Sequence, residues 1–294
     1  MKNGIFIVTS LTLALALTVA GAAAQPQQEE QKPEEQQQQQ EPTPFGFDLG
    51  TQEQQPPAGP TPEEQLAIEE LMRADNAQER LDLALQFLEN YPESVFRGRA
   101  YATAAEAYRM INDYARAIEY GERALELSPQ DAVTMIIVAD SLVESSLPTR
   151  ENYQDQLARA QDYVARALEI LPELFAGMEH RPEVPEEEYL RQQNYVEAQA
   201  HAVLGYVYYR QRAYEQAEAE LKQSIRLAPD RPNPMDFFRL GYTHVRQREY
   251  QEARDVFQQC VELMGERARG CQQQLERMEV ILERQASRSG GSRE

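Results

Sequence analysis

The sequence has no tryptophan, only two cysteines and only three histidines among its 294 residues. So few Cys and His side chains exclude a disulfide-rich scaffold and match no Cys/His zinc pattern. Basic residues are also scarce, since 29 Lys and Arg stand against 49 Asp and Glu, for a net charge of −20. A protein that neutralises phosphates needs the opposite balance, so nucleic acids and anionic membrane surfaces are excluded as expected partners.

Catalytic motifs are lacking as well. The sequence contains no Gly-rich phosphate loop, nucleophile elbow or paired-metal signature. Its histidines, His180, His201 and His244, lie far apart, and we expect none of them to have an acid or a cysteine at ligand spacing. The acidic run Glu186–Glu188 is typical of a solvated surface. We therefore expect no enzyme activity, no metal and no cofactor.

The chain begins with Met1-Lys2-Asn3, continues through an apolar stretch from Ile5 to Ala20, and reaches the small residues Ala22-Ala23-Ala24. This order of a charged, an apolar and a small-residue region is typical of a secretory signal peptide over residues 1–24. The alternative is an uncleaved anchor, because residues 5–24 come close to the roughly 20 residues that a membrane helix needs. Cleavage predicts a periplasmic or secreted protein with no further membrane insertion.

Residues 25–61 include 12 Gln, 7 Pro and 6 Glu. Such a composition cannot bury enough apolar surface to offset the entropy of ordering, so it predicts a disordered linker. Its one apolar island, Phe45-Gly46-Phe47-Asp48-Leu49, is interpreted as incidental, with a short docking motif as the alternative. A disordered tail is predicted over residues 286–294.

Between residues 62 and 285 the apolar residues have helical spacing, and a pattern with a period near 34 recurs four times. The copies span about 98–131, 132–174, 186–231 and 234–265. Each predicts two antiparallel helices that approach closely at small residues, which are Ala105, Ala139, Gly205 and Gly241 in the first helices and Ala117, Ala160, Ala217 and Ala253 in the second. One pair buries too little by itself, so the pairs must stack.

These residues resemble the tetratricopeptide repeat. The third copy shows the pattern as Leu204, Gly205, Tyr208, Ala217 and Pro229. The sequence departs from the family pattern in three ways. The family's Trp is absent, and its Phe is replaced by Gly121, Val164 and Leu221 in the first three copies. Its last Ala is replaced by Ser224 and Cys260 in two copies. The resemblance implies an all-α fold, a right-handed superhelical solenoid of antiparallel helix pairs. His201 and His244 occupy positions where the family usually has aromatic residues. The resemblance therefore predicts that both histidines pack inside the repeats.

Two insertions and two flanking elements complete the prediction. About 9 extra residues fall around Ser145–Asn152 and about 23 after Pro172, where a helix is expected to end. A long helix is predicted from residue 186 to about 210. A degenerate helix pair, from 61 to about 73 and from 76 to 91, precedes the repeats, and a capping helix follows over 267–284.

In this family the first helix of each repeat lines a concave groove, so the resemblance implies a protein or peptide ligand there. The implied groove residues are Arg99, Glu106, Arg109, Ile136, Asp140, Gln199, Tyr206, Tyr209, Phe238 and Tyr242. The groove would be charged at one end and aromatic at the other. The alternative is that the tyrosines pack against neighbouring repeats, or that the insertion at 172–187 covers the groove.

The leading interpretation is an exported, non-catalytic scaffold that holds a protein or peptide. The alternative is a structural or envelope-assembly component that self-associates through its repeats. Cys260 and Cys271 flank the turn before the capping helix almost symmetrically, and export would allow a disulfide between them. Two separate buried thiols are the alternative to that disulfide.

Overall fold

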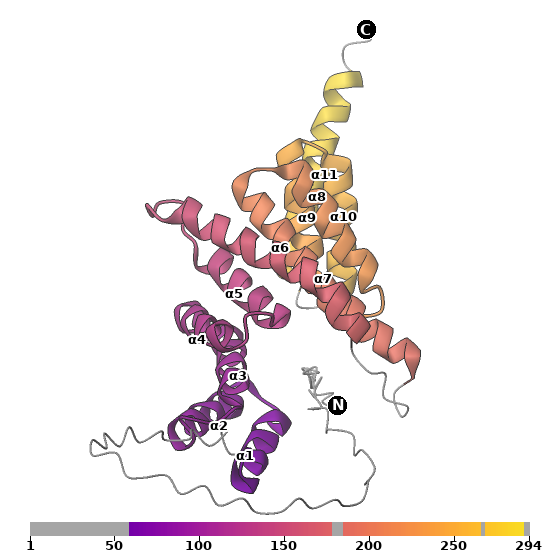
Figure 1. Ribbon diagram of the computed structural model, residues 1–294. Coiled ribbons are helices and arrows are strands. Elements are labelled where there is room, and N and C mark those ends of the chain that lie inside the picture. The colour runs from indigo at the N-terminus through magenta and orange to yellow at the C-terminus, as the bar shows by residue number, and fades with distance from the viewer. Residues whose placement is uncertain (1–58, 178–184, 266–267, 291–294) are drawn as a thin grey trace, which may run out of the picture.

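A computed structural model describes residues 59–177, 185–265 and 268–290 of the chain (Figure 1). The predicted signal peptide and nearly all of the predicted linker lie outside these residues. The described part holds eleven helices and no strand: α1 (Pro62–Arg73), α2 (Ala77–Asn90), α3 (Arg97–Met110), α4 (Tyr114–Leu127), α5 (Ala132–Ser145), α6 (Tyr153–Gly177), α7 (Glu186–Gln211), α8 (Tyr214–Leu227), α9 (Pro234–Gln247), α10 (Tyr250–Met264) and α11 (Arg269–Gly290). None of these helices is long and apolar enough to cross a membrane.

The helices form a solenoid of stacked pairs. Each of the pairs α3 with α4, α5 with α6, α7 with α8 and α9 with α10 makes one repeat. The first helices are also neighbours across repeats, since α3 contacts α5, α5 contacts α7 and α7 contacts α9. Figure 1 shows the order from α1 at one end to α11 at the other. The predicted all-α solenoid is therefore confirmed.

Side chains at the helix starts explain several boundaries. Thr61 accepts a hydrogen bond from the Glu64 backbone N–H at 3.2 Å, and Glu64 accepts one from the Thr61 N–H at 2.6 Å, which completes a capping box. The side chains of Asn76, Asp113 and Asp131 each accept one backbone N–H hydrogen bond at the starts of α2, α4 and α5. These bonds satisfy backbone donors that have no partner inside the helix.

Small residues set the distance between the helices of a pair. A Cβ added at Gly241 on α9 would lie 2.6 Å from a ring carbon of Phe257 on α10, and one at Gly205 on α7 would lie 2.8 Å from the Leu221 side chain on α8. Both partner side chains are completely buried. The glycines therefore let a large side chain of the second helix fill the pair's interior, as the sequence pattern predicted.

The turn between the two helices of a repeat uses an unusual backbone conformation. Asn112, Arg212 and Arg248 have φ angles of 63°, 66° and 67° and follow α3, α7 and α9. Each occupies the left-handed region, which L side chains other than Asn and Asp rarely adopt. The second repeat has instead the predicted insertion, a turn-rich segment over 146–152.

Two predicted boundaries are wrong. Helix α6 continues through Pro172 to Gly177, because Leu171, Leu174 and Phe175 bury apolar surface in the central core. Burial of this size can offset the lost backbone hydrogen bond, a defect that costs about 3 kcal/mol. Helix α11 continues to Gly290, so the tail predicted from residue 286 is helical to that point. Residues 291–294 lie outside the described part. The long helix predicted from residue 186 is α7.

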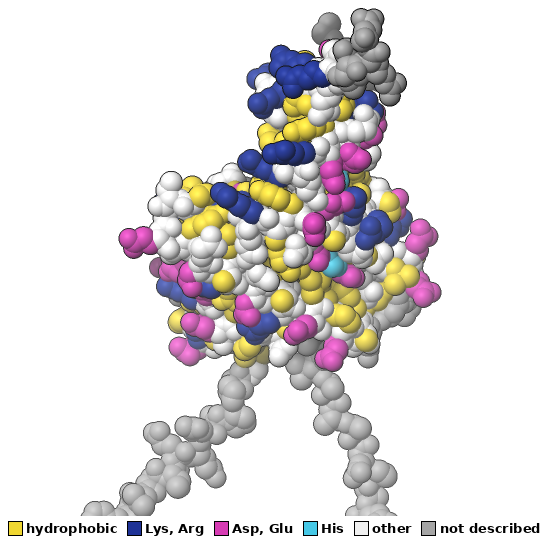
Figure 2. Space-filling model, turned by 90° about the horizontal axis from the view of Figure 1, so that it is seen from above, with side chains coloured by type: hydrophobic (Ala, Val, Ile, Leu, Met, Phe, Trp, Pro, Cys, Tyr) yellow, Lys and Arg dark blue, Asp and Glu magenta, His cyan; other side chains and the backbone are white. Residues whose placement is uncertain are grey.

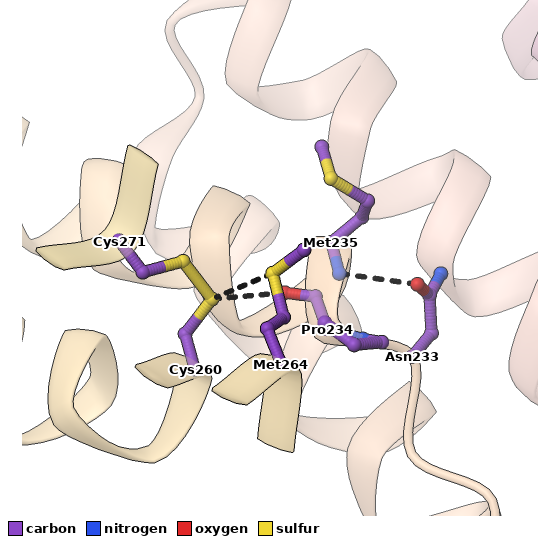
Figure 3. Close-up of a disulfide and its surroundings, with 6 residues drawn as sticks. All are labelled: Asn233, Pro234, Met235, Cys260, Met264 and Cys271. Carbon is purple, nitrogen blue, oxygen red and sulfur yellow. Dashed lines mark hydrogen bonds between the residues drawn. A yellow bond between two sulfur atoms is a disulfide. The ribbon is translucent and has the colours of Figure 1, made fainter. Parts of the chain in front are cut away.

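Ser224 and Cys260, the two residues that replace the family's last alanine, each form a bond to the helix that follows their own. The Ser224 hydroxyl on α8 donates to the Asp236 carboxylate on α9 at 2.7 Å. Cys260 on α10 is joined by a disulfide to Cys271 on α11, with the two Cα atoms 6.0 Å apart (Figure 3). The Met264 sulfur lies 3.8 Å from the Cys260 sulfur and helps to enclose the bridge. The disulfide thus fixes the capping helix to the last repeat.

We predict that Gly241→Ala lowers the free energy of unfolding by about 1 to 3 kcal/mol, because the added methyl group must displace the buried Phe257 ring. Gly177→Ala is the matched control, since nothing lies within 4 Å of a Cβ at that position. Urea denaturation followed by circular dichroism measures both variants. Equal stability of the two variants would contradict the close approach of α9 and α10.

We also predict that replacing both Cys260 and Cys271 with serine lowers the free energy of unfolding by about 3 kcal/mol, the chain-entropy value for a closed loop of about 12 residues. The measurement compares the variant with the wild type under non-reducing conditions. Thiol titration of the denatured, unreduced wild type is the control. Two free thiols in that titration would show that the bridge does not form.

Candidate functional site

The candidate site is the first-helix face, which we define as the surface formed by α3, α5, α7 and α9. These helices lie side by side, and their half-buried polar side chains meet across the repeats. Because each helix belongs to a different repeat, a ligand lying across this face would touch all four repeats. The residues that the family resemblance implied come from these helices.

Ion pairs connect consecutive elements at the N-terminal end of this face. Arg80 on α2 pairs with Glu106 on α3 at 3.2 Å, and Arg109 on α3 pairs with Asp140 on α5 at 3.1 Å. The Nε of Arg109 is buried and has no hydrogen-bond partner within the described residues. Arg99 is half-buried, and burial lowers the pKa of its guanidinium. The charged end of the face is therefore held in place by bonds between repeats.

A longer connection crosses the face from the second repeat to the fourth. Arg239 on α9 pairs with Glu144 on α5 at 2.6 Å, although 95 residues separate them. The guanidinium carbon of Arg239 also lies 4.0 Å from the centre of the Tyr206 ring on α7. Tyr206 thus lies beside a cation that links the repeats on either side of its own.

Arg210 on α7 has a similar role one turn away. It donates hydrogen bonds to the Tyr206 hydroxyl at 3.1 Å and to the backbone carbonyls of Val143 and Ser146 at 3.1 Å and 2.5 Å. Its guanidinium also lies over the ring of Tyr153 on α6. Arg210 therefore satisfies carbonyls at the end of α5, next to the insertion that replaces the ordinary turn.

Tyr209 is held less tightly than Tyr206. Its ring stacks on Tyr206 with the centroids 6.4 Å apart, and it is tilted against Tyr214 at 6.0 Å. A hydrogen bond with Tyr209 raises the pKa of Arg246 on α9. Tyr209 is half-buried and belongs to none of the hydrophobic clusters of the described residues. Its half-buried ring is therefore partly accessible to a ligand on this face.

Three of the implied groove residues serve the interior instead. Ile136 is only 5% exposed and lies in the central core. Phe238 and Tyr242 lie against the buried Phe257, with ring centroids 6.2 Å and 5.6 Å from it. The expectation that Ile136 faces a ligand is wrong, and the expected aromatic end of the groove is largely internal packing. Gln199 is exposed on α7, as expected.

The sequence prediction missed Glu144, Arg210 and Arg239. Helical spacing could have found them, because Glu144 follows Asp140 by four residues, Arg210 follows Tyr206 by four, and Arg239 precedes Tyr242 by three. The carboxylates of Glu144 and Asp140, after the larger effect of burial, also raise the pKa of the Tyr114 hydroxyl. The face is thus a mixed network of charges and aromatic rings.

The tetratricopeptide repeat family matches residues 66–130, 198–231 and 237–263. The chain contains tetratricopeptide repeats. The first match includes the helix pair that was predicted as degenerate, α1 with α2, and the second and third cover most of the last two predicted repeats. No catalytic family is indicated, and proteins built from these repeats are generally non-catalytic scaffolds that bind proteins. The second predicted repeat lies outside the three matches, although α5 and α6 pair as the other repeats do.

No curated protein matches the sequence. Among solved structures, the chain is similar to a thermophilic TPR protein of Thermus thermophilus, at 16% identity and a TM-score of 0.48, over 74% of this chain and 96% of that one. It is similar to PilW, a type IV pilus biogenesis factor, at 21% identity and a TM-score of 0.47, over 75% and 90%. It is also similar to pilF of Pseudomonas aeruginosa, at 17% identity and a TM-score of 0.45, over 75% of this chain and 89% of that one.

A buried carboxyl next to the face gives a test of the repeat interface by pH. Asp236 on α9 is 2% exposed and accepts hydrogen bonds from Ser224 and from the Asn233 side chain at 3.1 Å. Burial raises the pKa of Asp236 from 3.8 to about 6, although Ser224 and Arg239 act in the opposite direction. The folded state therefore binds this proton more tightly than the unfolded state does.

This difference contributes stability that is fully present below pH 3.8 and is lost as the pH rises through 6. The rise in pKa corresponds to about 3 kcal/mol of folding stability that is present at low pH and absent at high pH. We predict that Asp236→Asn, which cannot ionise, gains up to about that much stability relative to the wild type between pH 4 and pH 7.5. Urea denaturation at both pH values measures the gain. Asp162→Asn, at an exposed position on α6, controls for the change of net charge. A stability difference between Asp236→Asn and wild type that is the same at both pH values would contradict the prediction.

Proposed function

We propose that this protein is a non-catalytic scaffold of the periplasm or cell exterior, and that it binds a protein or peptide segment on the first-helix face. The repeat fold supports a role in protein–protein interaction. The order of charged, apolar and small residues at the N-terminus supports export. The proposed partner is a protein, in keeping with a surface on which acidic and basic side chains are interspersed with apolar ones (Figure 2).

The observation that carries the proposal is the network around Tyr209. Tyr209, Tyr206 and the exposed Gln199 are presented by one helix, and Arg210, Arg239 and Arg246 hold the two tyrosines. An aromatic side chain that is fixed before binding loses little further entropy in a complex. Tyr and Arg are also the residue types that most often dominate protein interfaces.

The ion pairs on this face constrain the partner. Glu106, Asp140 and Glu144 are already paired with arginines within the chain. A ligand that required those carboxylates would have to break bonds that connect the repeats, which leaves buried charges without partners. We therefore assign recognition to Tyr209, Gln199 and Arg246, and positioning of the repeats to the ion pairs.

We predict that Tyr209→Ala reduces retention of the partner at least about fivefold, which corresponds to the 1 to 2 kcal/mol that an aromatic interface residue contributes. The exported protein serves as bait in an envelope extract of the exporting cell, and mass spectrometry quantifies what is retained. Tyr195→Ala is the matched control, because Tyr195 is 39% exposed on the same helix but precedes the repeat that begins near residue 198.

The thermal midpoint of Tyr209→Ala should stay close to that of the wild type, since Tyr209 is outside the hydrophobic clusters. Equal retention by the two variants would contradict a ligand site at Tyr209. Recovery of the bait alone would instead favour the self-associating envelope component.

A further inference from the structure

Three helices bring a histidine and two carboxylates together on the side of the fourth repeat. Glu218 on α8, His244 on α9 and Glu249, at the N-cap position of α10, each offer one ligand atom, and these atoms lie within 4.8 Å of one another. The sequence interpretation found no acid at ligand spacing from His244. That interpretation was wrong, because Glu249 follows it by five residues and packing adds Glu218 from the preceding repeat.

The histidine is buried, while the carboxylates remain accessible. His244 is 2% exposed, whereas the side chains of Glu218 and Glu249 are 23% and 43% exposed. The Nδ1 of His244 lies 2.7 Å from a carboxylate oxygen of Glu249. An ion could therefore enter from the carboxylate side and reach an imidazole nitrogen that is already oriented by its surroundings.

A neighbouring amide offers a further possible ligand to this cluster. The Gln247 amide nitrogen donates to Glu218 Oε2 at 3.0 Å, but the Gln247 amide oxygen is buried and has no partner within the described residues. A buried acceptor without a partner is energetically unfavourable. If the amide turned over, this oxygen would face the cluster, where it could add an oxygen ligand to the two carboxylates, and the amide nitrogen would take the buried position.

We propose that Glu218, His244 and Glu249 form a Zn²⁺ site. One nitrogen and two carboxylate oxygens are a donor set that zinc accepts, and two negative charges balance the charge of the ion. Ligand atoms around tetrahedral zinc lie about 3.3 Å apart, as follows from zinc–ligand distances of about 2.0 to 2.1 Å. His244 Nδ1 and a Glu249 oxygen already lie 2.7 Å apart and all three ligand atoms lie within 4.8 Å, so an ion requires only small movements of the two carboxylate side chains.

Lys222 is the main opposing feature. Its ammonium lies 2.5 Å from Glu218 Oε1, so it competes with a cation for that carboxylate. The other oxygen, Oε2, faces Gln247 and is the one left for the metal. Lys222→Gln should therefore bind zinc more tightly than the wild type, which is the opposite of its effect if Lys222 merely stabilised the fold around the cluster.

The zinc proposal does not rest on the proposed function, and its test uses zinc alone. We expect the EDTA-treated full chain to bind one Zn²⁺ in isothermal titration calorimetry at pH 7.5 and to unfold at a higher temperature when zinc is present. His244→Phe, which restores the aromatic residue usual at this position, and Glu249→Gln should each weaken binding at least about tenfold. Glu252→Gln, on the exposed side of α10, should bind as the wild type does.

A second histidine, His201, which is half-buried, provides the decisive comparison. His201 Nδ1 lies 2.5 Å from Glu220, and its Nε2 lies 3.7 Å from Glu197, so it could also attract zinc. Binding that survives His201→Phe and is lost in His244→Phe supports the proposal. No zinc binding by the wild type, or binding that is lost only in His201→Phe, would overturn it.

Discussion

The close approach of two helices within each pair is the constraint on which the remaining structure depends. A helix pair of this size buries too little surface to fold by itself, so every repeat relies on filling its interior and stacking on the next. Leu221 and Phe257 fill that interior, and they can do so only because Gly205 and Gly241 carry no side chain where those groups lie. A methyl group at either glycine would separate the helices and, with them, the repeats on both sides.

Stacking at a fixed distance also explains why polar groups far apart in the sequence meet. Helices α5 and α9 belong to the second and fourth repeats. Glu144 on α5 pairs with Arg239 on α9, and the Arg239 guanidinium lies over the ring of Tyr206 on α7, in the repeat between them. Half-buried pairs of this kind add little net stability, but loss of one partner leaves a charge that water cannot fully solvate. The ion pairs therefore fix how one repeat lies against another more than they hold the chain together.

Repetition made most of the fold predictable, and local departures from it limited the rest. The small residues and their period located the helix pairs, and Thr61 with Glu64 located the first helix. Pro172 misled because a proline normally ends a helix, while here Leu174 and Phe175 gain burial from continuing it. The left-handed Arg212 and Arg248 gave no signal, since glycine or asparagine is the usual sign of that conformation.

The candidate sites show where sequence reasoning stops. Family positions placed Tyr206 and Tyr209 on the correct helix, but they could not separate Tyr209, which lies outside the hydrophobic clusters of the described residues, from Tyr242, which packs on Phe257. That distinction depends on which second-helix side chain is large enough to reach the first helix. The same limit applies where the repeat pattern is broken. Ser224 and Cys260 replace a small alanine, and His244 replaces an aromatic ring, yet each substitution is explained only by a partner on the following helix. A repeat fold keeps its packing positions constant, so the residues that depart from them are the ones whose chemistry must be sought across the helix interface.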